Sequence, residues 1–208
     1  MEEEMPDLTL LHTAEVHVET FRALAPEADL DQHVRADWLE RAQGGIDAAL
    51  KAEIAETVEA ADGLVLCTCT TLGPAAEDAG AIRIDWPMMQ EAARTGGPVL
   101  MAYCLESTAG PSEALLRRAF GARDPELTCL ELGQHWPLFE AGEGAGFAAA
   151  IAEDVAEALA AMDFGCVVLA QASMAGAAEL LREQTRVPVL ASPEIAVRAL
   201  LAEHKAGA

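Results

Sequence analysis

Two short segments of this 208-residue chain place chemically useful side chains directly after apolar runs. In the first, Cys69 and two threonines follow a run that begins at Gly63; in the second, Gln171 and Ser173 follow a run that begins at Gly165. Such runs are typical of strands buried in a parallel sheet, and open α/β sheets bind ligands at the carboxyl ends of their strands. A thiol at such a place can act as an acid, a base or a nucleophile, whereas an amide has no acid–base chemistry near neutral pH. The sequence therefore predicts an asymmetric pair of strand ends, with a reactive group at Cys69 only.

The other cysteines have simpler interpretations. Cys67 shares a face with Cys69 if the strand continues that far, and we interpret it as a small buried residue. A Cys-x-Cys pair can also bind a metal, with His12 and Cys104 as the nearest further ligands. No second closely spaced ligand pair exists, so we predict no metal site. The odd number of cysteines, 5 in all, argues against a disulfide framework.

Apolar β-like runs alternate with helical patterns along almost the whole chain. We predict strands at residues 8–12, 30–34, 64–69, 99–104, 127–132, 166–170 and 187–190. We predict helices at residues 15–24, 46–59, 88–95, 113–120, 147–162, 177–184 and 194–203. In the helix at 147–162, Phe147, Ile151, Val155, Leu159 and Met162 form one apolar stripe. The alternation predicts an α/β fold with parallel sheets, and it excludes a helical bundle or a β-sandwich.

The clearest break is the Thr-Gly-Gly-Pro sequence at residues 95–98, near the middle of the chain. Gln171 lies 102 residues after Cys69 (171 − 69), close to half of the chain's 208 residues, which indicates an internal duplication. We therefore predict two similar Rossmann-like lobes, related by a pseudo-twofold axis and separated by a cleft. The predicted first lobe is 1–95 plus 191–208, and the second is 96–190.

The chain is strongly acidic, with a formal net charge of −22 at pH 7. Such a charge repels phosphate, so we expect no binding to nucleic acid or to an anionic membrane surface. An anionic substrate would need strong local hydrogen-bond donors. No stretch approaches the roughly 20 apolar residues of a membrane span, and the acidic start lacks the basic residues of a signal peptide. A cytoplasmic location is the resulting expectation.

Several segments, taken in order, resemble motifs of the aspartate/glutamate/hydantoin racemase superfamily, to which arylmalonate decarboxylase and maleate isomerase are related. Residues 66–71 resemble its first cysteine motif, and residues 83–88 are similar to a segment reading Arg-Ile-Asp-Glu-Pro-Met. Residues 105–112 are similar to its Leu-Pro-Ser-Thr-Leu-x-Pro-Thr loop. Residues 169–175 align with the second cysteine motif, roughly Leu-Gly-Cys-Ala-Gly-Met-Ala, and residues 10–13 with the first cleft-lining strand end.

The resemblance implies a small carboxylic acid bound between two lobes, without a metal or an organic cofactor. Racemases of this family place two cysteines on opposite faces of the substrate's α-carbon. This chain has Gln171 at the second position, so we do not expect it to racemise by two bases. Cys166 lies five residues earlier, inside the predicted strand, and does not replace the missing thiol. A single Cys69 can still protonate an enediolate left by decarboxylation, or add to an activated double bond.

We predict Cys69 and Gln171 as the catalytic residues, surrounded by donors that stabilise negative charge on the substrate. The predicted substrate-binding residues are Thr13, Thr70, Thr71, Ser107, Thr108, Ala172 and Ser173. Some of them have a second interpretation: Ser107 and Thr108 also suit the cap of a following helix, and so does Ser173.

The leading functional hypothesis is a cofactor-independent enzyme of isomerase or decarboxylase type that acts on a small carboxylic acid. The alternative is a non-catalytic carboxylate-binding protein with the same fold. A third interpretation is a structural α/β protein whose cysteines only fill its core. The expected partner is a small molecule, with neither nucleic acid nor membrane, and the family's frequent dimers are compatible with a homodimer.

Overall fold

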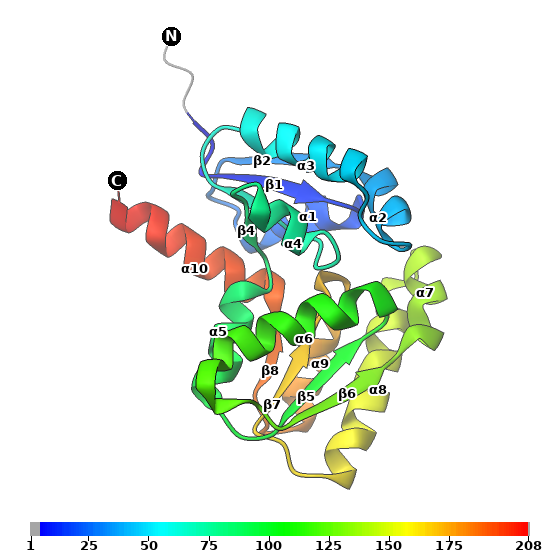
Figure 1. Cartoon of the computed structure of the whole chain (residues 1–208). Coiled ribbons are helices and arrows are strands. Elements are labelled where there is room, and N and C mark those ends of the chain that lie inside the picture. Colours follow the sequence, from blue (N-terminus) through cyan, green and yellow to red (C-terminus); the bar gives the residue numbers. More distant parts are fainter. Residues whose placement is uncertain (1–4, 208) are drawn as a thin grey trace. The chain divides into compact units, whose positions relative to one another are not determined.

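The structure is a computed structural model that describes residues 5–207, with side chains described through residue 202. Its contacts group the chain into two units, Met1–Ile84 with Ala196–Ala208, and Asp85–Ile195. Each unit contains one four-stranded sheet whose paired strands are all parallel, with helices packed against it (Figure 1). This architecture confirms the predicted α/β class with two Rossmann-like lobes. The domain limits at 95/96 and 190/191 stay a prediction, because a grouping of contacts does not show which segments fold independently.

The first unit has the strand order β2-β1-β3-β4. Its elements are β1 (Leu8–His12), α1 (Val16–Leu24), β2 (Leu30–Val34), α2 (Ala36–Ala42), α3 (Ala48–Ala60), β3 (Val65–Cys67), α4 (Gly73–Asp78) and β4 (Ile82–Arg83). Leu11, Val65 and Cys67 belong to a core that also contains buried side chains of α2, α3 and α4. From α1, the buried Phe21 contacts the ring of His12, whose side chain lies on the opposite face of the sheet from Leu11.

The second unit has the corresponding order β6-β5-β7-β8, as a duplication predicts. Its elements are α5 (Trp86–Thr95), β5 (Val99–Tyr103), α6 (Glu106–Phe120), β6 (Leu127–Glu131), α7 (Trp136–Glu140), α8 (Gly144–Ala161), β7 (Cys166–Leu169), α9 (Ala175–Gln184) and β8 (Val189–Ala191). Helix α10 (Ser192–Gly207) starts in this unit and continues into the first.

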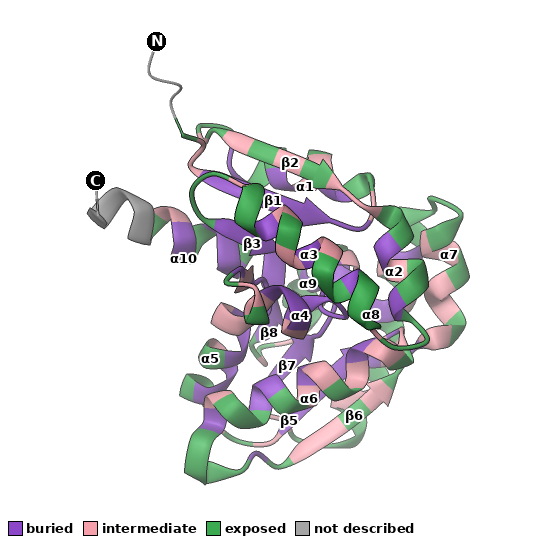
Figure 2. Cartoon of the chain, turned by 45° about the horizontal axis from the view of Figure 1, so that its top comes forward, coloured by how far each residue is buried: buried purple, intermediate pink, exposed green. Residues whose placement is uncertain are grey.

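Alternating residues of the central strand β5 enter two different cores. Leu100 and Ala102 pack with α8 and α9, whereas Val99 and Met101 pack with α5 and α6. Neighbouring side chains of a strand point to opposite faces, so a continuous apolar run is expected when helices cover both faces. The central strands are buried along their length, and the edge strands β2 and β6 are only partly buried (Figure 2).

All seven predicted strands and all seven predicted helices are present in the described part of the chain; β1 and β2 have the predicted bounds, and the other elements have shifted ends. The prediction missed the two-residue β4 and the short helices α2, α4 and α7. It also started α6 too late, because Pro111 lies inside this helix and not before it. The predicted stripe on α8 is wrong at Met162, which follows the end of the helix and is 54% exposed.

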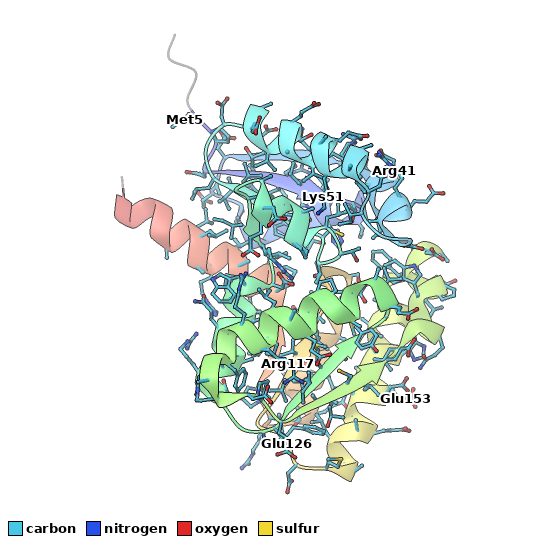
Figure 3. All side chains as sticks on the ribbon, viewed as in Figure 1. Met5, Arg41, Lys51, Arg117, Glu126 and Glu153 are labelled. Carbon is cyan, nitrogen blue, oxygen red and sulfur yellow. The ribbon has the colours of Figure 1, made fainter. Side chains whose placement is uncertain are left out.

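Charged side chains lie largely on the outward faces of the helices (Figure 3). Arg41 forms an ion pair with Glu53 at 2.9 Å, and Arg117 forms ion pairs with Glu113 and Asp124. Exposed pairs of this kind contribute little to stability, typically about 0–1 kcal/mol each. Within the described residues, no helix is both long enough and apolar enough to cross a membrane.

Candidate functional site

The candidate site in the first unit lies where β1 and β3 end side by side. The chain leaves β1 toward β2 on one side and leaves β3 toward β4 on the other, so these two strands form a topological switch point. In doubly wound sheets, ligands bind in the crevice outside the carboxyl ends of such strands. Thr13 follows β1, and residues 68–71 follow β3; all of them are buried.

Cys69 lies in the turn after β3, since this strand ends at Cys67 and not at 69. The Cys67 Sγ–H donates a weak hydrogen bond to the Cys69 carbonyl oxygen at 3.5 Å. Neither cysteine forms a disulfide bond, and both belong to the core on the α3 side of the sheet. Cys69 is the more accessible of the two, with 8% of its surface exposed against 2% for Cys67. The predicted reactive thiol is therefore at the carboxyl edge, and the predicted inert one is inside the strand.

The turn continues through Thr70 and Thr71 into α4. The Gly73 N–H donates to the Thr70 carbonyl oxygen at 3.1 Å, which closes the turn. The buried Arg83 side chain at the end of β4 packs on Gly73, and its Nε lies 2.8 Å from the position that a Cβ would occupy there. A permanent positive charge thus lies at the start of α4, two residues after Thr71. Sequence reasoning quoted Arg83 only within a motif, although an arginine in an otherwise apolar strand was a usable signal.

His12, the last residue of β1, is part of a hydrogen-bonded chain to the same turn. Its Nδ1 lies 2.8 Å from the Thr68 hydroxyl oxygen, and this hydroxyl donates to the Leu11 carbonyl oxygen at 3.0 Å. The single hydroxyl proton is committed to Leu11, so Nδ1 is the donor to Thr68, and the ring can also donate from Nε2 to Gln32 only when it is charged. Burial lowers the pKa of His12, partly offset by the Nε2 contact with Gln32 Oε1 at 3.0 Å. Sequence reasoning weighed His12 only as a metal ligand; the structure shows it as a group that holds the residue before Cys69.

His17 of α1 provides a pH test of this environment. It lies 6.1 Å from the His12 ring, and burial, followed by the charge of His12, lowers the pKa of His17 to about 4. The unfolded chain binds a proton as the pH falls through about 6.5, while the folded chain does so only near 4. We therefore expect the contribution of His17 to the free energy of unfolding to be complete above about pH 6.5 and to fall by about 3 kcal/mol as the pH decreases to 4.

The measurement is urea unfolding at pH 7 and at pH 4.5, for the wild type and for His17→Gln. The variant keeps hydrogen-bonding groups but does not titrate, so its loss of stability between the two pH values should be much smaller. His33→Gln, at an exposed position of β2, is the matched control and should keep the wild-type loss. Equal losses in all three proteins would contradict the assignment of this acid sensitivity to His17.

The candidate site in the second unit lies at the equivalent place, where β5 and β7 end side by side. The Gln171 side-chain oxygen, Oε1, accepts hydrogen bonds from the backbone N–H of Cys104 at 2.6 Å and of Leu105 at 3.0 Å. Ala172, which follows Gln171 in the chain, is buried. Thr108, three residues after Leu105, is also buried, and Ser107 is partly buried. Burial raises the pKa of Cys104 to about 12 and that of Cys166 to about 11, so neither thiol ionises near neutral pH.

The structure corrects both capping interpretations. Ser107 and Thr108 lie within the first turn of α6, whose N-cap residue is Leu105 and has no side-chain hydrogen bond. The N-cap residue of α9 is Met174, not Ser173. The Ser173 Oγ is buried and has no hydrogen-bond partner among the described residues.

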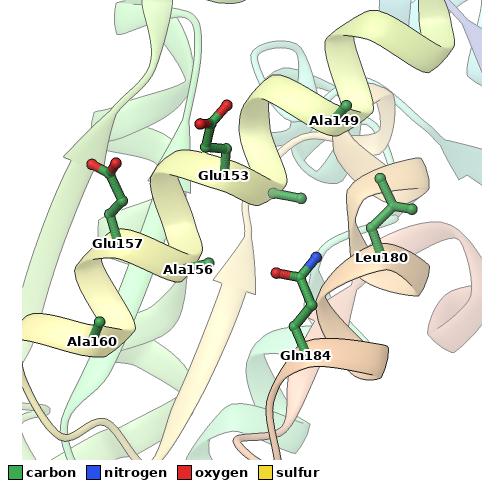
Figure 4. A pocket seen from close by; sticks show the side chains of 8 residues that line it. Ala149, Glu153, Ala156, Glu157, Ala160, Leu180 and Gln184 are labelled. Carbon is green, nitrogen blue, oxygen red and sulfur yellow. The ribbon is translucent and has the colours of Figure 1, made fainter.

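Among the described residues, no group of three His, Cys, Asp or Glu side chains is placed to hold a metal ion. A surface groove of about 580 Å³ lies along α8 and α9 (Figure 4). It is lined by Ala149, Ala152, Glu153, Ala156, Glu157, Ala160, Leu180 and Gln184. The groove is formed by the later turns of both helices, from Ala149 to Ala160 in α8 and from Leu180 to Gln184 in α9.

The strand orders and the polar strand ends define the class of fold: two α/β units, each with its switch point beside the first strand of its sheet. Several solved structures have this fold. An allantoin racemase from Klebsiella pneumoniae is 21% identical, with a TM-score of 0.65, over 96% of this chain and 88% of that one. A glutamate racemase from Francisella tularensis, in complex with D-glutamate, is 12% identical, with a TM-score of 0.70, over 95% of this chain and 81% of that one. An unliganded arylmalonate decarboxylase is 12% identical, with a TM-score of 0.60, over 97% and 93%.

No protein-family model matches the chain, and no curated protein is significantly similar to it. At these low identities the structural similarity establishes the fold. The chain thus has the fold of the racemases and of arylmalonate decarboxylase, and the predicted resemblance is confirmed at that level.

Proposed function

We propose that this protein is a racemase-like enzyme that acts on a small carboxylic acid through a single cysteine, Cys69. The observation that carries the proposal is the position of this thiol at the switch point of the first unit, in a turn followed by buried Thr70 and Thr71. The shared fold of racemases and a decarboxylase supports the same kind of chemistry.

Two reactions are compatible with one thiol. In the first, a malonate-type substrate loses carbon dioxide, its C–C electron pair forms an enediolate, and the Cys69 S–H protonates the α-carbon from one face. The resulting thiolate recovers its proton from water. In the second, the Cys69 thiolate adds to the double bond of an unsaturated diacid, the former double bond rotates as a single bond, and elimination of the thiolate restores it. Neither route needs a second acid–base group.

Both routes place negative charge on a carboxylate or an enediolate. We propose that residues 13, 70 and 71 supply hydrogen-bond donors at the switch point of the first unit, and that residues 107, 108, 172 and 173 supply them at the switch point of the second. Gln171 is proposed to contribute the N–H groups of its amide, since its oxygen is bonded to Cys104 and Leu105. Each well-placed donor contributes about 3 kcal/mol to stabilising a transition state of this kind.

The test is incubation of the protein in heavy water with a panel of aryl-malonic acids, unsaturated diacids and amino acids, followed by proton NMR. Decarboxylation with deuterium at the α-carbon, or isomerisation of a double bond, is the expected result. Racemisation of an amino acid with α-deuterium exchange at a rate independent of Cys69 would contradict the mechanism. Binding of panel members without any turnover would instead indicate a carboxylate-binding protein.

A further inference from the structure

The amide of Gln171 occupies a place built for an oxygen atom. Two successive backbone N–H groups, of Cys104 and Leu105, point at its Oε1 from 2.6 and 3.0 Å. These N–H groups lie between the end of β5 and the first turn of α6. Two backbone donors converging on one oxygen at such distances form the geometry of an oxyanion hole.

The start of α6 adds to the preference for negative charge. This helix has 15 residues, and its N-cap residue Leu105 provides no side-chain acceptor. Backbone N–H groups at the start of a helix carry partial positive charge, and Gln171 Oε1 is the acceptor for the N–H of Leu105. It does so from a buried position, with only 6% of the residue exposed.

The orientation of the Gln171 amide is fixed, and a buried hydroxyl lies close to it in the chain. The two N–H donors require the oxygen, so the amide nitrogen must point away from them. The Ser173 Oγ, two residues further on, is buried and has no hydrogen-bond partner among the described residues. A buried polar group without a partner is rare in folded proteins, and it indicates a missing partner such as a ligand oxygen.

We propose that Gln171 is an internal ligand whose amide oxygen fills an oxyanion nest formed by the backbone N–H groups of Cys104 and Leu105. Removal of this side chain opens the nest to a small carboxylate. In the intact protein the nest is closed to external anions, and the second unit instead offers the Gln171 N–H groups to an acceptor oxygen. This inference goes beyond the proposed function, because it holds whether or not Cys69 carries out chemistry.

The test is acetate binding to Gln171→Ala. The substitution removes four heavy atoms beyond Cβ, and acetate consists of four heavy atoms in the same arrangement. We expect acetate to raise the melting temperature of the variant, to shift its Cys104 and Leu105 amide signals in ¹⁵N–¹H NMR spectra, and to bind at least about tenfold more tightly than to the wild type. Neutral acetamide should bind more weakly than acetate.

The matched control is Gln184→Ala, at an exposed glutamine of α9, which should respond to acetate as the wild type does. A folded Gln171→Ala protein whose two amide signals ignore acetate would overturn the proposal, and so would equal binding by the wild type. A preference for acetamide over acetate would overturn the assignment to an oxyanion. None of these measurements depends on turnover, so they remain informative if the proposed reaction fails.

Gln171→Glu keeps the proposal testable if Gln171→Ala does not fold. Its carboxylate has the shape of the amide and should enter the nest, so we expect a folded protein that is insensitive to acetate. Its stability relative to the wild type should be greater at pH 7 than at pH 4, because the ionised form is the better acceptor. A relative stability that decreases as the introduced carboxyl ionises would contradict the nest.

Discussion

Replacing Cys69 with alanine is expected to lower kcat/KM of the proposed reaction by roughly 10²–10⁴-fold, the range that a positioned acid–base group contributes. Gln171 cannot take over, because an amide does not titrate near neutral pH and its oxygen is already bonded to two backbone N–H groups. Cys69→Ser should be similarly inactive, since a serine hydroxyl ionises far less readily than a thiol. The rate is measured by proton NMR in heavy water with the best substrate of the panel.

Cys67→Ala is the matched control for this experiment. It removes a thiol two residues away, in the same core and with the same small change of volume, but inside β3. We expect nearly unchanged kcat/KM and only a modest loss of stability. If Cys67→Ala lost as much activity as Cys69→Ala, the effect would come from packing of the core, and the assignment of Cys69 as the catalytic thiol would be wrong.

Gly165→Ala is expected to lower the free energy of unfolding by about 3 kcal/mol or more, which is the largest expected effect on stability. Gly165 precedes β7 and donates its N–H to the Pro98 carbonyl oxygen at 2.7 Å. A Cβ at this position would overlap the Gly96 carbonyl oxygen and lie 3.0 Å from Gly97 Cα. Both obstacles are backbone atoms of a turn whose glycines have φ of 72° and 77°, so no side-chain rotation relieves the overlap.

The comparison is Gly146→Ala, in the first turns of α8. A Cβ there has only an ordinary contact, at 3.9 Å from Glu143 Oε2, and helix propensity favours alanine over glycine by about 0.5–1 kcal/mol. Urea unfolding should therefore show a loss for Gly165→Ala and a small gain for Gly146→Ala. A Gly165→Ala protein within about 1 kcal/mol of the wild type would show that the turn moves aside easily.

Gly63 allows a close backbone approach in the first unit, as Gly165 does in the second. It precedes β3, has φ of 73°, and a Cβ there would lie 3.0 Å from the Pro6 carbonyl oxygen. The sequence displays both glycines as the starts of matching apolar runs, 102 residues apart (165 − 63). The reason for the match, a close approach between neighbouring backbone segments, is visible only in three dimensions.

Much of the fold could be predicted because its signals are local. The run from Val99 to Tyr103 is apolar at nearly every position, which requires a strand covered on both faces, and β5 is such a strand. Helix α8 follows from the spacing of Phe147, Ile151 and Val155. The elements that were missed, β4, α2, α4 and α7, are short, and their formation depends on neighbours that are distant in sequence. The start of α6 was missed because Pro111 lies inside this helix.

The sequence by itself determined that Cys69 and Gln171 follow buried strands, since this depends on residue order and hydrophobicity alone. Tertiary structure decided what these groups contact. Gln171 meets the backbone of residues 104 and 105, 67 and 66 positions away, and His12 meets Thr68 from 56 positions away. Such hydrogen bonds need two strand ends at one sheet edge, and backbone N–H groups are present at every non-proline position, so no residue pattern reveals which of them converge.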